Sequence, residues 1–165
     1  MTIGAGSEGD FLAAMEPLFE GAPRFLRRLA AARPFASSDE LFTRAREIAL
    51  AMPEDEQIEL VNAHPRLGAA PESVSALSFR EQGYDRSAPA PVDVATELER
   101  LNDAYEARFG FRYCVFVAGR SREALIPGFR AALDADRDTE LRRALVAVVD
   151  IARDRHGKLA EAAAR

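Results

Sequence analysis

The stretch TELRRALVAVVDIARDRHGKL, residues 139–159, gives the clearest indication of the fold class. Its apolar residues recur at helical spacing, which predicts a long helix with one buried stripe. With about 100° of rotation per residue, Arg155 and His156 fall on this stripe, whereas Arg153 falls well to one side. The apolar members of the stripe are Leu141, Leu145, Val148, Val149, Ala152 and Leu159.

Shorter segments repeat the same period and predict further helices. Ser37 and Glu40 have the spacing of a capping box, so a helix is expected to begin there and to run to Met52. Gly110 is expected to cap another helix in the left-handed conformation. The remaining helices are predicted over residues 55–63, 78–82, 94–109 and 122–133.

Between these helices the chain shows loop-forming and extended segments. Residues 66–76 and 87–91 hold prolines, serines or glycine and predict loops. Residues 113–117 form the one β-type run, and without a partner strand they are expected to be extended chain crossing the core. We predict an all-α, single-domain helical bundle with one short extended segment, spanning residues 1–165 with a flexible N-terminus over about residues 1–8.

Composition narrows the classes of function. The chain has 165 residues, a formal net charge of -5, two histidines and the single cysteine Cys114. This charge argues against nucleic acid as a partner, and one cysteine excludes an intrachain disulfide and a four-cysteine zinc site, so we expect no metal. No stretch approaches the roughly 18 apolar residues that span a bilayer, and the N-terminus does not resemble a signal peptide. We expect a cytoplasmic protein without membrane contact.

Arg155 is the first candidate for chemistry, because an arginine on a buried stripe needs an anion. One interpretation is an internal ion pair with a glutamate, or a side chain whose stem alone is buried. The other is a guanidinium that holds a substrate carboxylate in a bidentate pair. Spacing alone does not separate the two. His156 is expected to be a core or interface histidine.

Two further candidates lie in the middle of the chain. His64 precedes Pro65, which places it at or just past a helix C-terminus, where the helix dipole favours an imidazolium that could donate a proton. The competing interpretation is a histidine that only satisfies helix carbonyls. Ser78, Glu81 and Gln82 would share one helix face, although Ser-x-x-Glu is also the pattern of a capping box.

Several short motifs, taken in order, carry a resemblance to a known family. They are Arg33-Pro34-Phe35, His64-Pro65-Arg66-Leu67-Gly68, Ser78-Phe79-Arg80-Glu81-Gln82, Leu101-Asn102-Asp103-Ala104-Tyr105, Arg108-Phe109-Gly110-Phe111 and Ile151-Ala152-Arg153-Asp154-Arg155. In this order and spacing the chain resembles the decarboxylases of 2-oxo-4-hydroxy-4-carboxy-5-ureidoimidazoline (OHCU). The resemblance implies an all-α fold, a homodimer, no metal or organic cofactor, and conversion of OHCU to (S)-allantoin and CO₂ in urate degradation.

The resemblance also assigns site residues. It implies a catalytic histidine at His64, an active-site glutamate at Glu81 and a substrate-binding arginine at Arg155. It places the remaining substrate contacts at Pro65, Ser78 and Gln82, and along the extended run at Phe111, Tyr113, Cys114 and Val115, where backbone amides would face the substrate.

Two departures from the family pattern leave alternatives open. This chain has Phe111-Arg112-Tyr113 where the family commonly has Phe-Pro-Phe, and Arg66 follows Pro65 in the histidine motif. Pocket walls set specificity, so a decarboxylase of a related ureido or purine-derived acid is one alternative. A helical binding module that kept the fold and lost the reaction is another, because fold does not fix function.

Overall fold

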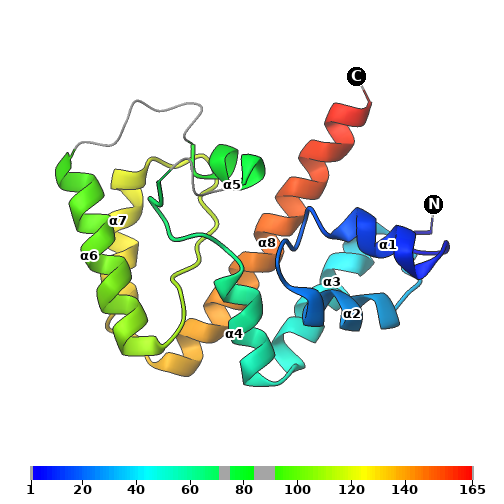
Figure 1. Ribbon diagram of the computed structural model, residues 1–165, viewed down its shortest axis with the longest axis horizontal. Coiled ribbons are helices and arrows are strands. Elements are labelled where there is room, and N and C mark those ends of the chain that lie inside the picture. The colour runs from blue at the N-terminus through cyan, green and yellow to red at the C-terminus, as the bar shows by residue number, and fades with distance from the viewer. Residues whose placement is uncertain (1, 71–74, 84–91, 165) are drawn as a thin grey trace. The chain divides into compact units, whose positions relative to one another are not determined.

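The computed structural model describes residues 2–70, 75–83 and 92–164, and helices are the main secondary structure of these residues (Figure 1). They divide into two compact units, one formed by residues 1–63 with 145–165 and the other by residues 64–144. The predicted single-domain organisation stays a prediction. The helices are α1 (Glu8–Met15), α2 (Pro23–Ala31), α3 (Ser38–Ala51), α4 (Glu54–Asn62), α5 (Ala76–Glu81), α6 (Val92–Phe109), α7 (Arg122–Ala132) and α8 (Arg137–Ala163).

Helix α8 is the stretch that indicated the fold class. Its first residues, up to Ala144, belong to the 64–144 unit, and the helix continues from Leu145 into the other unit. The apolar residues of its predicted stripe are buried except at one position, and His156 is half-buried. Leu159 is 43 % exposed, because the helix extends past its packed region into residues that are exposed on every side. Within the described residues, no helix is long and apolar enough to cross a membrane.

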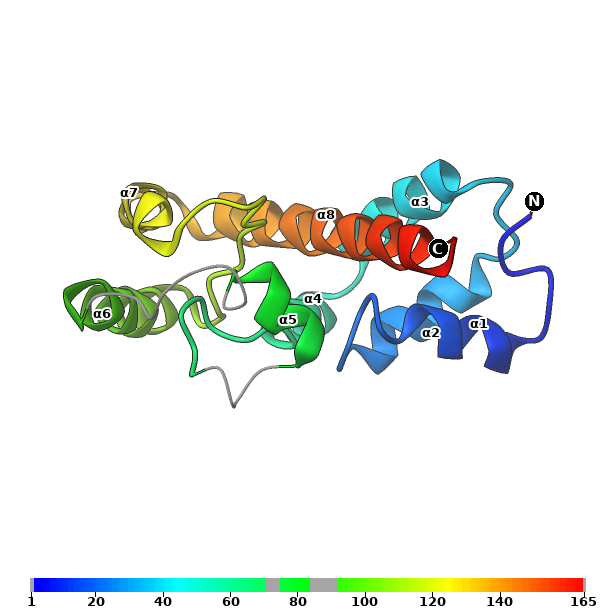
Figure 2. The same ribbon diagram turned by 90° about the horizontal axis from the view of Figure 1, so that it is seen from above.

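In the 64–144 unit, helices α6 and α7 lie side by side (Figure 2). Val94, Leu98, Leu101 and Tyr105 form the buried face of α6, as their spacing predicts. Gly110 ends α6 with a φ of 79°, which confirms the left-handed cap. The chain then runs through residues 111–117 without helix or strand, which agrees with the expectation that residues 113–117 are not helical.

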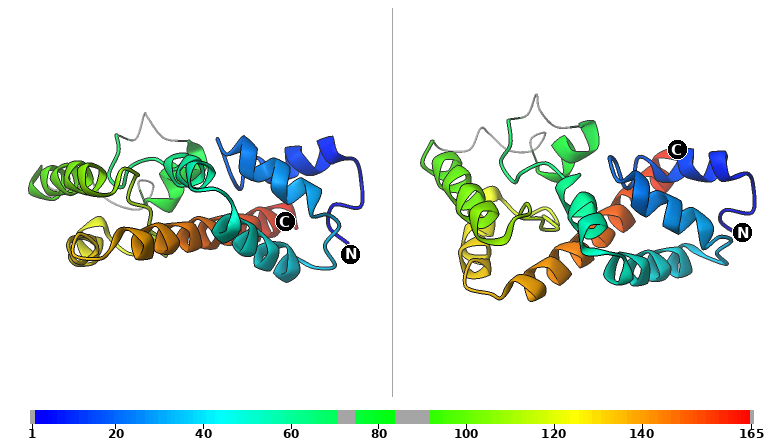
Figure 3. Two further views of the ribbon diagram at one scale, coloured as in Figure 1. Left: turned by 90° about the horizontal axis from the view of Figure 1, so that it is seen from below. Right: turned by 60° about the horizontal axis from the view of Figure 1, so that its bottom comes forward.

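In the other unit, α2 packs against α1, α3 and α4 (Figure 3). Ser37 caps α3 by accepting a hydrogen bond from the Glu40 N–H at 3.2 Å, as predicted, but the Glu40 carboxylate accepts from the N–H of Ala36 rather than of Ser37. The predicted helices did not include α1 or α2. Residue Ile3, in the N-terminal segment expected to be flexible, exchanges two backbone hydrogen bonds with Phe35.

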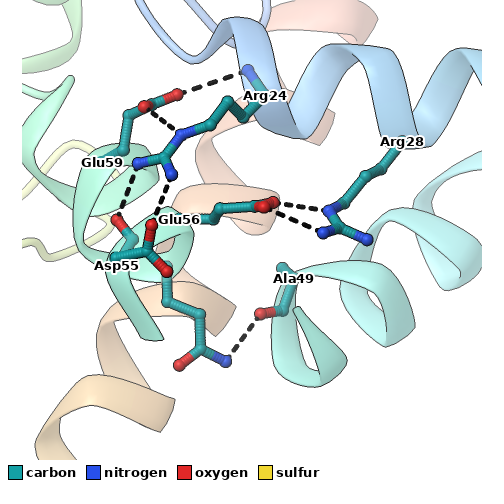
Figure 4. A network of polar contacts seen from close by, with 7 residues as sticks. Arg24, Arg28, Ala49, Asp55, Glu56 and Glu59 are labelled. Carbon is teal, nitrogen blue, oxygen red and sulfur yellow. Dashed lines mark hydrogen bonds and ion pairs between the residues drawn. The ribbon is translucent and has the colours of Figure 1, made fainter. Parts of the chain in front are cut away.

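Ion pairs on the surface join α2 to α4 (Figure 4). The guanidinium of Arg24 contacts the carboxylates of Asp55 and Glu59, each at 2.5 Å, and Arg28 contacts Glu56 at 2.5 Å. These five residues are called the α2–α4 network below. The arginines hold the pKa values of the Asp55 and Glu56 carboxyls below their ordinary range, because a hydrogen-bonded guanidinium favours the charged form.

Candidate active site

His64 lies two residues past the end of α4 and begins the 64–144 unit. Its side chain is buried, as expected for a group that acts on a ligand out of contact with bulk water. Residues 64–68, called the His64 loop below, have no regular secondary structure of their own. Side chains from elsewhere in the unit hydrogen-bond its backbone, so its conformation is set by tertiary contacts.

Gln82 makes two of these contacts. Its side-chain oxygen accepts from the N–H of Gly68 at 2.8 Å, and its side-chain nitrogen donates to the carbonyl of Arg66 at 3.1 Å. Gln82 is the C-cap of α5, the helix that carries Glu81. The α5 end that presents the predicted carboxylate is therefore hydrogen-bonded to the loop that begins with the predicted proton donor.

Asn102 of α6 makes a third contact with the His64 loop. Its buried amide nitrogen donates to the carbonyls of Leu67 at 3.0 Å and Leu98 at 2.8 Å. Gly68, which follows Leu67, has a φ of 79°, and a Cβ on this residue would lie 2.9 Å from the Leu98 side chain. The loop can approach α6 this closely only because residue 68 is a glycine.

Helix α5 differs in detail from the sequence prediction. Ser75 caps the helix by accepting from the N–H of Ser78 at 3.2 Å, so Ser78 is not the first residue of a capping box. Ser78 lies inside the helix and is 3 % exposed, while Glu81 is half-buried.

In segment 111–117 the side chains of Phe111 and Tyr113 are buried in the core, whereas Phe116 is half-buried. The Tyr113 ring stacks on Phe129 with centroids 3.7 Å apart, and Phe111 packs edge-on against Tyr105. Cys114 is also buried, and its carbonyl accepts from Arg143 at 2.8 Å. Substrate contacts from Phe111, Tyr113 and Cys114 would therefore be made by backbone groups, as the resemblance implies.

A buried polar cluster holds this segment against the start of α8. The Tyr105 hydroxyl donates to Glu140 at 2.6 Å, and Arg143 pairs with the same carboxylate at 2.9 Å. Burial raises the pKa of the Tyr105 hydroxyl, and Glu140 raises it further. Burial opposes the charge of Arg143, but the hydrogen bond and the charge of Glu140 outweigh it and raise the pKa of the guanidinium.

Arg155 lies in the other unit and is 2 % exposed, which confirms its predicted place on the inner face of α8. Its Nη1 donates to the carbonyl of Pro17 at 3.0 Å and lies 3.4 Å from the Glu20 carboxylate. A glutamate partner is what the structural interpretation predicted. Arg153 is about half exposed, as expected, and His156 packs edge-on against Phe42 at 5.5 Å.

The residues predicted for the site thus fall in both units. The 64–144 unit contains His64, Pro65, Ser78, Glu81, Gln82 and the extended segment, and its hydrogen bonds connect the His64 loop to α5 and α6. Their convergence with Arg155 on one cavity stays a prediction. Within the described ranges, no group of three or more His, Cys, Asp or Glu residues could hold a metal ion.

A sequence model of the family described as OHCU decarboxylase matches residues 5–157. The chain belongs to the OHCU decarboxylase family. It is 28 % identical over 145 residues to the 2-oxo-4-hydroxy-4-carboxy-5-ureidoimidazoline decarboxylase of Haloferax volcanii, covering 88 % of this chain and 86 % of that protein. It is 33 % identical over 138 residues to the uric acid degradation bifunctional protein PucL of Bacillus subtilis, covering 84 % of this chain. The match spans only 28 % of the length of PucL.

Two solved structures share the fold of this chain. A crystal structure of OHCU decarboxylase in the presence of (S)-allantoin superimposes with a TM-score of 0.71 at 20 % identity, covering 93 % of this chain and 98 % of that one. A crystal structure of (S)-allantoin synthase gives a TM-score of 0.66 at 16 % identity, covering 93 % of this chain and 50 % of that one. These likenesses confirm the predicted all-α fold.

Both arginines that depart from the usual OHCU decarboxylase pattern make contacts with the protein. Arg66 pairs with Glu106 at 2.6 Å and with Asp103 at 2.9 Å, and the hydrogen bonds to these carboxylates raise the pKa of its guanidinium. Arg112 donates to the carbonyl of His64 at 3.1 Å. Neither contact needs a ligand, which weakens the inference that these arginines select a different acid.

The sequence did not reveal the residues that hold the site in place. Asn102 and Glu140 are buried polar side chains that only the fold connects to the site, through contacts with residues at least 35 positions away. One signal was present for Asn102, since it lies on the apolar stripe of α6 between Leu101 and Tyr105. A polar side chain on such a stripe indicates a buried hydrogen bond.

Proposed function

We propose that this chain converts OHCU to (S)-allantoin and CO₂, as the names of its relatives and of the matching crystal structures suggest. The observation that carries the proposal is the hydrogen-bonded connection between two predicted catalytic elements. Gln82, next to Glu81, bonds the backbone of the His64 loop at two points. An imidazole and a carboxylate held on connected elements suit an enzyme that must place one proton on one carbon.

The reaction needs one bond broken and one proton delivered. The bond between the reacting carbon and its carboxylate breaks, CO₂ leaves, and the electron pair delocalises into the neighbouring C=N bond. His64, as an imidazolium, then gives its proton to the adjacent ureido-bearing carbon from one face, which sets the S configuration. The hydroxyl passes its proton to the ring nitrogen and becomes the ring carbonyl, and His64 takes another proton from solvent. General acid help of this kind is worth about 10²–10⁴ in rate.

Glu81 and Arg155 complete the proposal. Glu81 would orient the substrate hydroxyl and nitrogens, and Arg155 would hold an anionic or carbonyl group of the ligand. The contact of Arg155 with Glu20 and with the Pro17 carbonyl fixes one end of the guanidinium. Because the guanidinium carries five N–H groups in a planar fork, holding it in this way also orients the N–H groups that a substrate would meet.

The test compares the two histidines of the chain. His64→Asn should lower the turnover of freshly prepared OHCU by about 10²-fold or more and remove the enantiomeric excess of the allantoin formed. His156→Asn is the matched control, because His156 packs against Phe42 in the other unit, and it should keep the wild-type excess. OHCU decays unaided to racemic product, so the excess measures catalysis directly. A His64→Asn chain with wild-type turnover and excess would contradict the proposal.

A second test addresses the proposed contact between the Arg155 guanidinium and the substrate. Arg155→Met keeps much of the buried stem but removes all donors, so it should raise KM by about tenfold or more. Arg153→Met changes a half-exposed arginine on the same helix and should leave KM unchanged. A lower melting temperature with unchanged KM in Arg155→Met would instead favour the purely structural role of an internal ion pair.

One alternative keeps support from a specific observation. An inactive binding module would also hold Arg155 against Glu20, because that contact needs no substrate. Such a module would give racemic allantoin at the unaided rate, so the same assay separates it from an enzyme.

We also propose that the protein acts as a cytoplasmic homodimer in allantoin formation. The support is the resemblance of its motifs to the family. Size-exclusion chromatography with light scattering should give a mass near twice 18.1 kDa. A mass near 18.1 kDa at assay concentrations would contradict the dimer.

A further inference from the structure

Side chains hydrogen-bond the backbone of the His64 loop at every position except Pro65. Side chains bond the carbonyls of His64, Arg66 and Leu67 and the N–H of Gly68. The partners come from three separate elements, namely α5, α6 and the extended segment 111–117. A short irregular loop held in this way has few conformations available, and the side chains that it carries are oriented accordingly.

The contact made by Arg112 is the one at His64 itself. Residue 65 is a proline and has no N–H, so the peptide between His64 and Pro65 can form hydrogen bonds only through the His64 carbonyl. Arg112 Nη1 donates to this carbonyl at 3.1 Å, from a residue 48 positions further along the chain. Fixing that peptide plane fixes ψ of His64, and with it the direction of the Cα–Cβ bond that carries the imidazole.

Arg112 also connects segment 111–117, which is predicted to contact the substrate through its backbone, with the His64 loop. Its neighbours Phe111 and Tyr113 are packed into the aromatic cluster around Tyr105, so the backbone of this segment is anchored on both sides of Arg112. A guanidinium extending from an anchored segment transmits the position of that segment to the His64 backbone. At this position the chain has an arginine where the related pattern commonly has a proline, which has no side-chain donor.

We propose that Arg112 is a positioning residue that fixes the peptide after His64 and thereby directs proton delivery to one face of the ureido-bearing carbon. This inference rests on the proposed function. It assigns Arg112 an effect on turnover and stereochemistry, and none on substrate affinity. A shift of about 1 Å in a reacting group can cost up to 10²-fold in rate, so loss of one of the four backbone contacts should give a measurable part of that loss.

The experiment measures kcat, KM and the enantiomeric excess of allantoin for wild type, Arg112→Met, Arg112→Gln and Arg112→Lys. The excess is compared at matched total turnover, with more enzyme added for slow variants, so that unaided decay contributes equally. Arg108→Met is the matched control. Its guanidinium also donates to a backbone carbonyl, that of Ala135 at 3.2 Å, which lies outside the His64 loop.

We expect Arg112→Met and Arg112→Gln to lower kcat by about tenfold and to lower the excess, with KM changed by less than about twofold. Arg112→Lys keeps the charge and a donor of similar reach, and should recover most of both losses. Arg108→Met should match wild type. If Arg112 only stabilised the fold, its variants would have a lower melting temperature and a smaller active fraction. Their enantiomeric excess at matched turnover would equal that of wild type.

Three outcomes would overturn the inference. If Arg112→Met or Arg112→Gln folds and keeps the wild-type kcat and enantiomeric excess, the contact does not position His64. A change in KM alone would make Arg112 a substrate contact instead. A wild-type chain that gives only racemic allantoin would overturn the proposed function, and the positioning role with it, whereas an active wild type with unchanged variants would overturn the positioning role alone.

Discussion

The α2–α4 network and the polar contacts of the 64–144 unit both join segments that are distant in sequence, but they do so in different ways. In the α2–α4 network, charged side chains meet other charged side chains at the surface, where Asp55 is 70 % exposed (Figure 4). Around the His64 loop, buried or half-buried side chains meet backbone groups, as Asn102 does at Leu67. Solvent screens the first kind of contact and is excluded from the second.

The two kinds of contact should therefore respond differently when one partner is removed. An exposed ion pair tolerates rearrangement, because water replaces a lost partner at little cost. A buried side chain that bonds a backbone carbonyl leaves that carbonyl unsatisfied when it is removed, and the backbone shifts to recover a partner. We therefore expect substitutions in the α2–α4 network to have small effects on both stability and activity, and substitutions around the His64 loop and Glu140 to have large ones.

The largest effect on stability is expected at Glu140. Glu140→Gln removes the charge that Arg143 and the Tyr105 hydroxyl share in the core, and should lower the free energy of unfolding by about 2–4 kcal/mol. The matched control is Glu47→Gln, which breaks the exposed Arg44–Glu47 pair with the same spacing of three residues, and should cost less than about 0.5 kcal/mol. Urea unfolding followed by circular dichroism measures both. Equal losses in the two variants would remove the distinction between the regions.

A smaller effect is expected at Asn102. Asn102→Ala removes a buried amide that donates to two carbonyls, and should cost about 1–3 kcal/mol because the Leu67 carbonyl loses its partner. It should also lower kcat, since Leu67 belongs to the His64 loop. Glu99→Ala, at an exposed position of the same helix, serves as the control and should change neither quantity. Full stability and activity in Asn102→Ala would show that the loop does not depend on this contact.

The α2–α4 network should respond weakly and mainly to salt. Asp55→Asn removes the most exposed carboxylate of the network, a partner of Arg24, and we expect the melting temperature to fall by less than about 2 °C. In 1 M NaCl the difference from wild type should vanish, because salt screens exposed charges over about 3 Å. Differential scanning calorimetry at both salt concentrations checks this. A large, salt-independent loss would mean that the network behaves like the buried contacts.

The smallest effect is expected in the pH dependence of the free energy of unfolding, through Glu97 on α6. Hydrogen bonds from Arg100 and Arg130 lower the pKa of Glu97 from 4.5 to about 2. A lowered folded-state pKa stabilises the fold above the unfolded pKa of 4.5, and the contribution is lost as pH falls to about 2. The difference in urea midpoint between wild type and Glu97→Gln should therefore be constant from pH 7 to about 5 and disappear near pH 2. A difference that grows on acidification would have the opposite sign and contradict the assignment.

Much of the architecture could be predicted, because periodicity and capping act locally. The stripe on α8 predicted that Arg155 would be buried and Arg153 exposed, and the structure confirms both. The predicted α3 cap at Ser37 is confirmed as well. Helix α2 was missed although the sequence carries a signal for it, since Pro23 opens the segment and Phe25, Leu26 and Leu29 follow at helical spacing.

The support of the candidate site could not be predicted, because it depends on contacts between distant residues. Gln82 was assigned to substrate on the basis of family resemblance, and in the structure its amide holds the Gly68 N–H and the Arg66 carbonyl. Each amide atom can form a second hydrogen bond, so a substrate contact stays a prediction. Arg112 could be recognised in the sequence only as a departure from a pattern, whereas its bond to the His64 carbonyl follows from the fold.

The most direct test of the account is a crystal structure of this chain with (S)-allantoin bound. We predict that the His64 imidazole and the Arg155 guanidinium contact the same ligand molecule, with Glu81 beside it and Arg112 still bonded to the His64 carbonyl. Allantoin bound away from His64, or an Arg155 that contacts only Pro17, Leu18 and Glu20 in the complex, would contradict the claim that these residues form one active site.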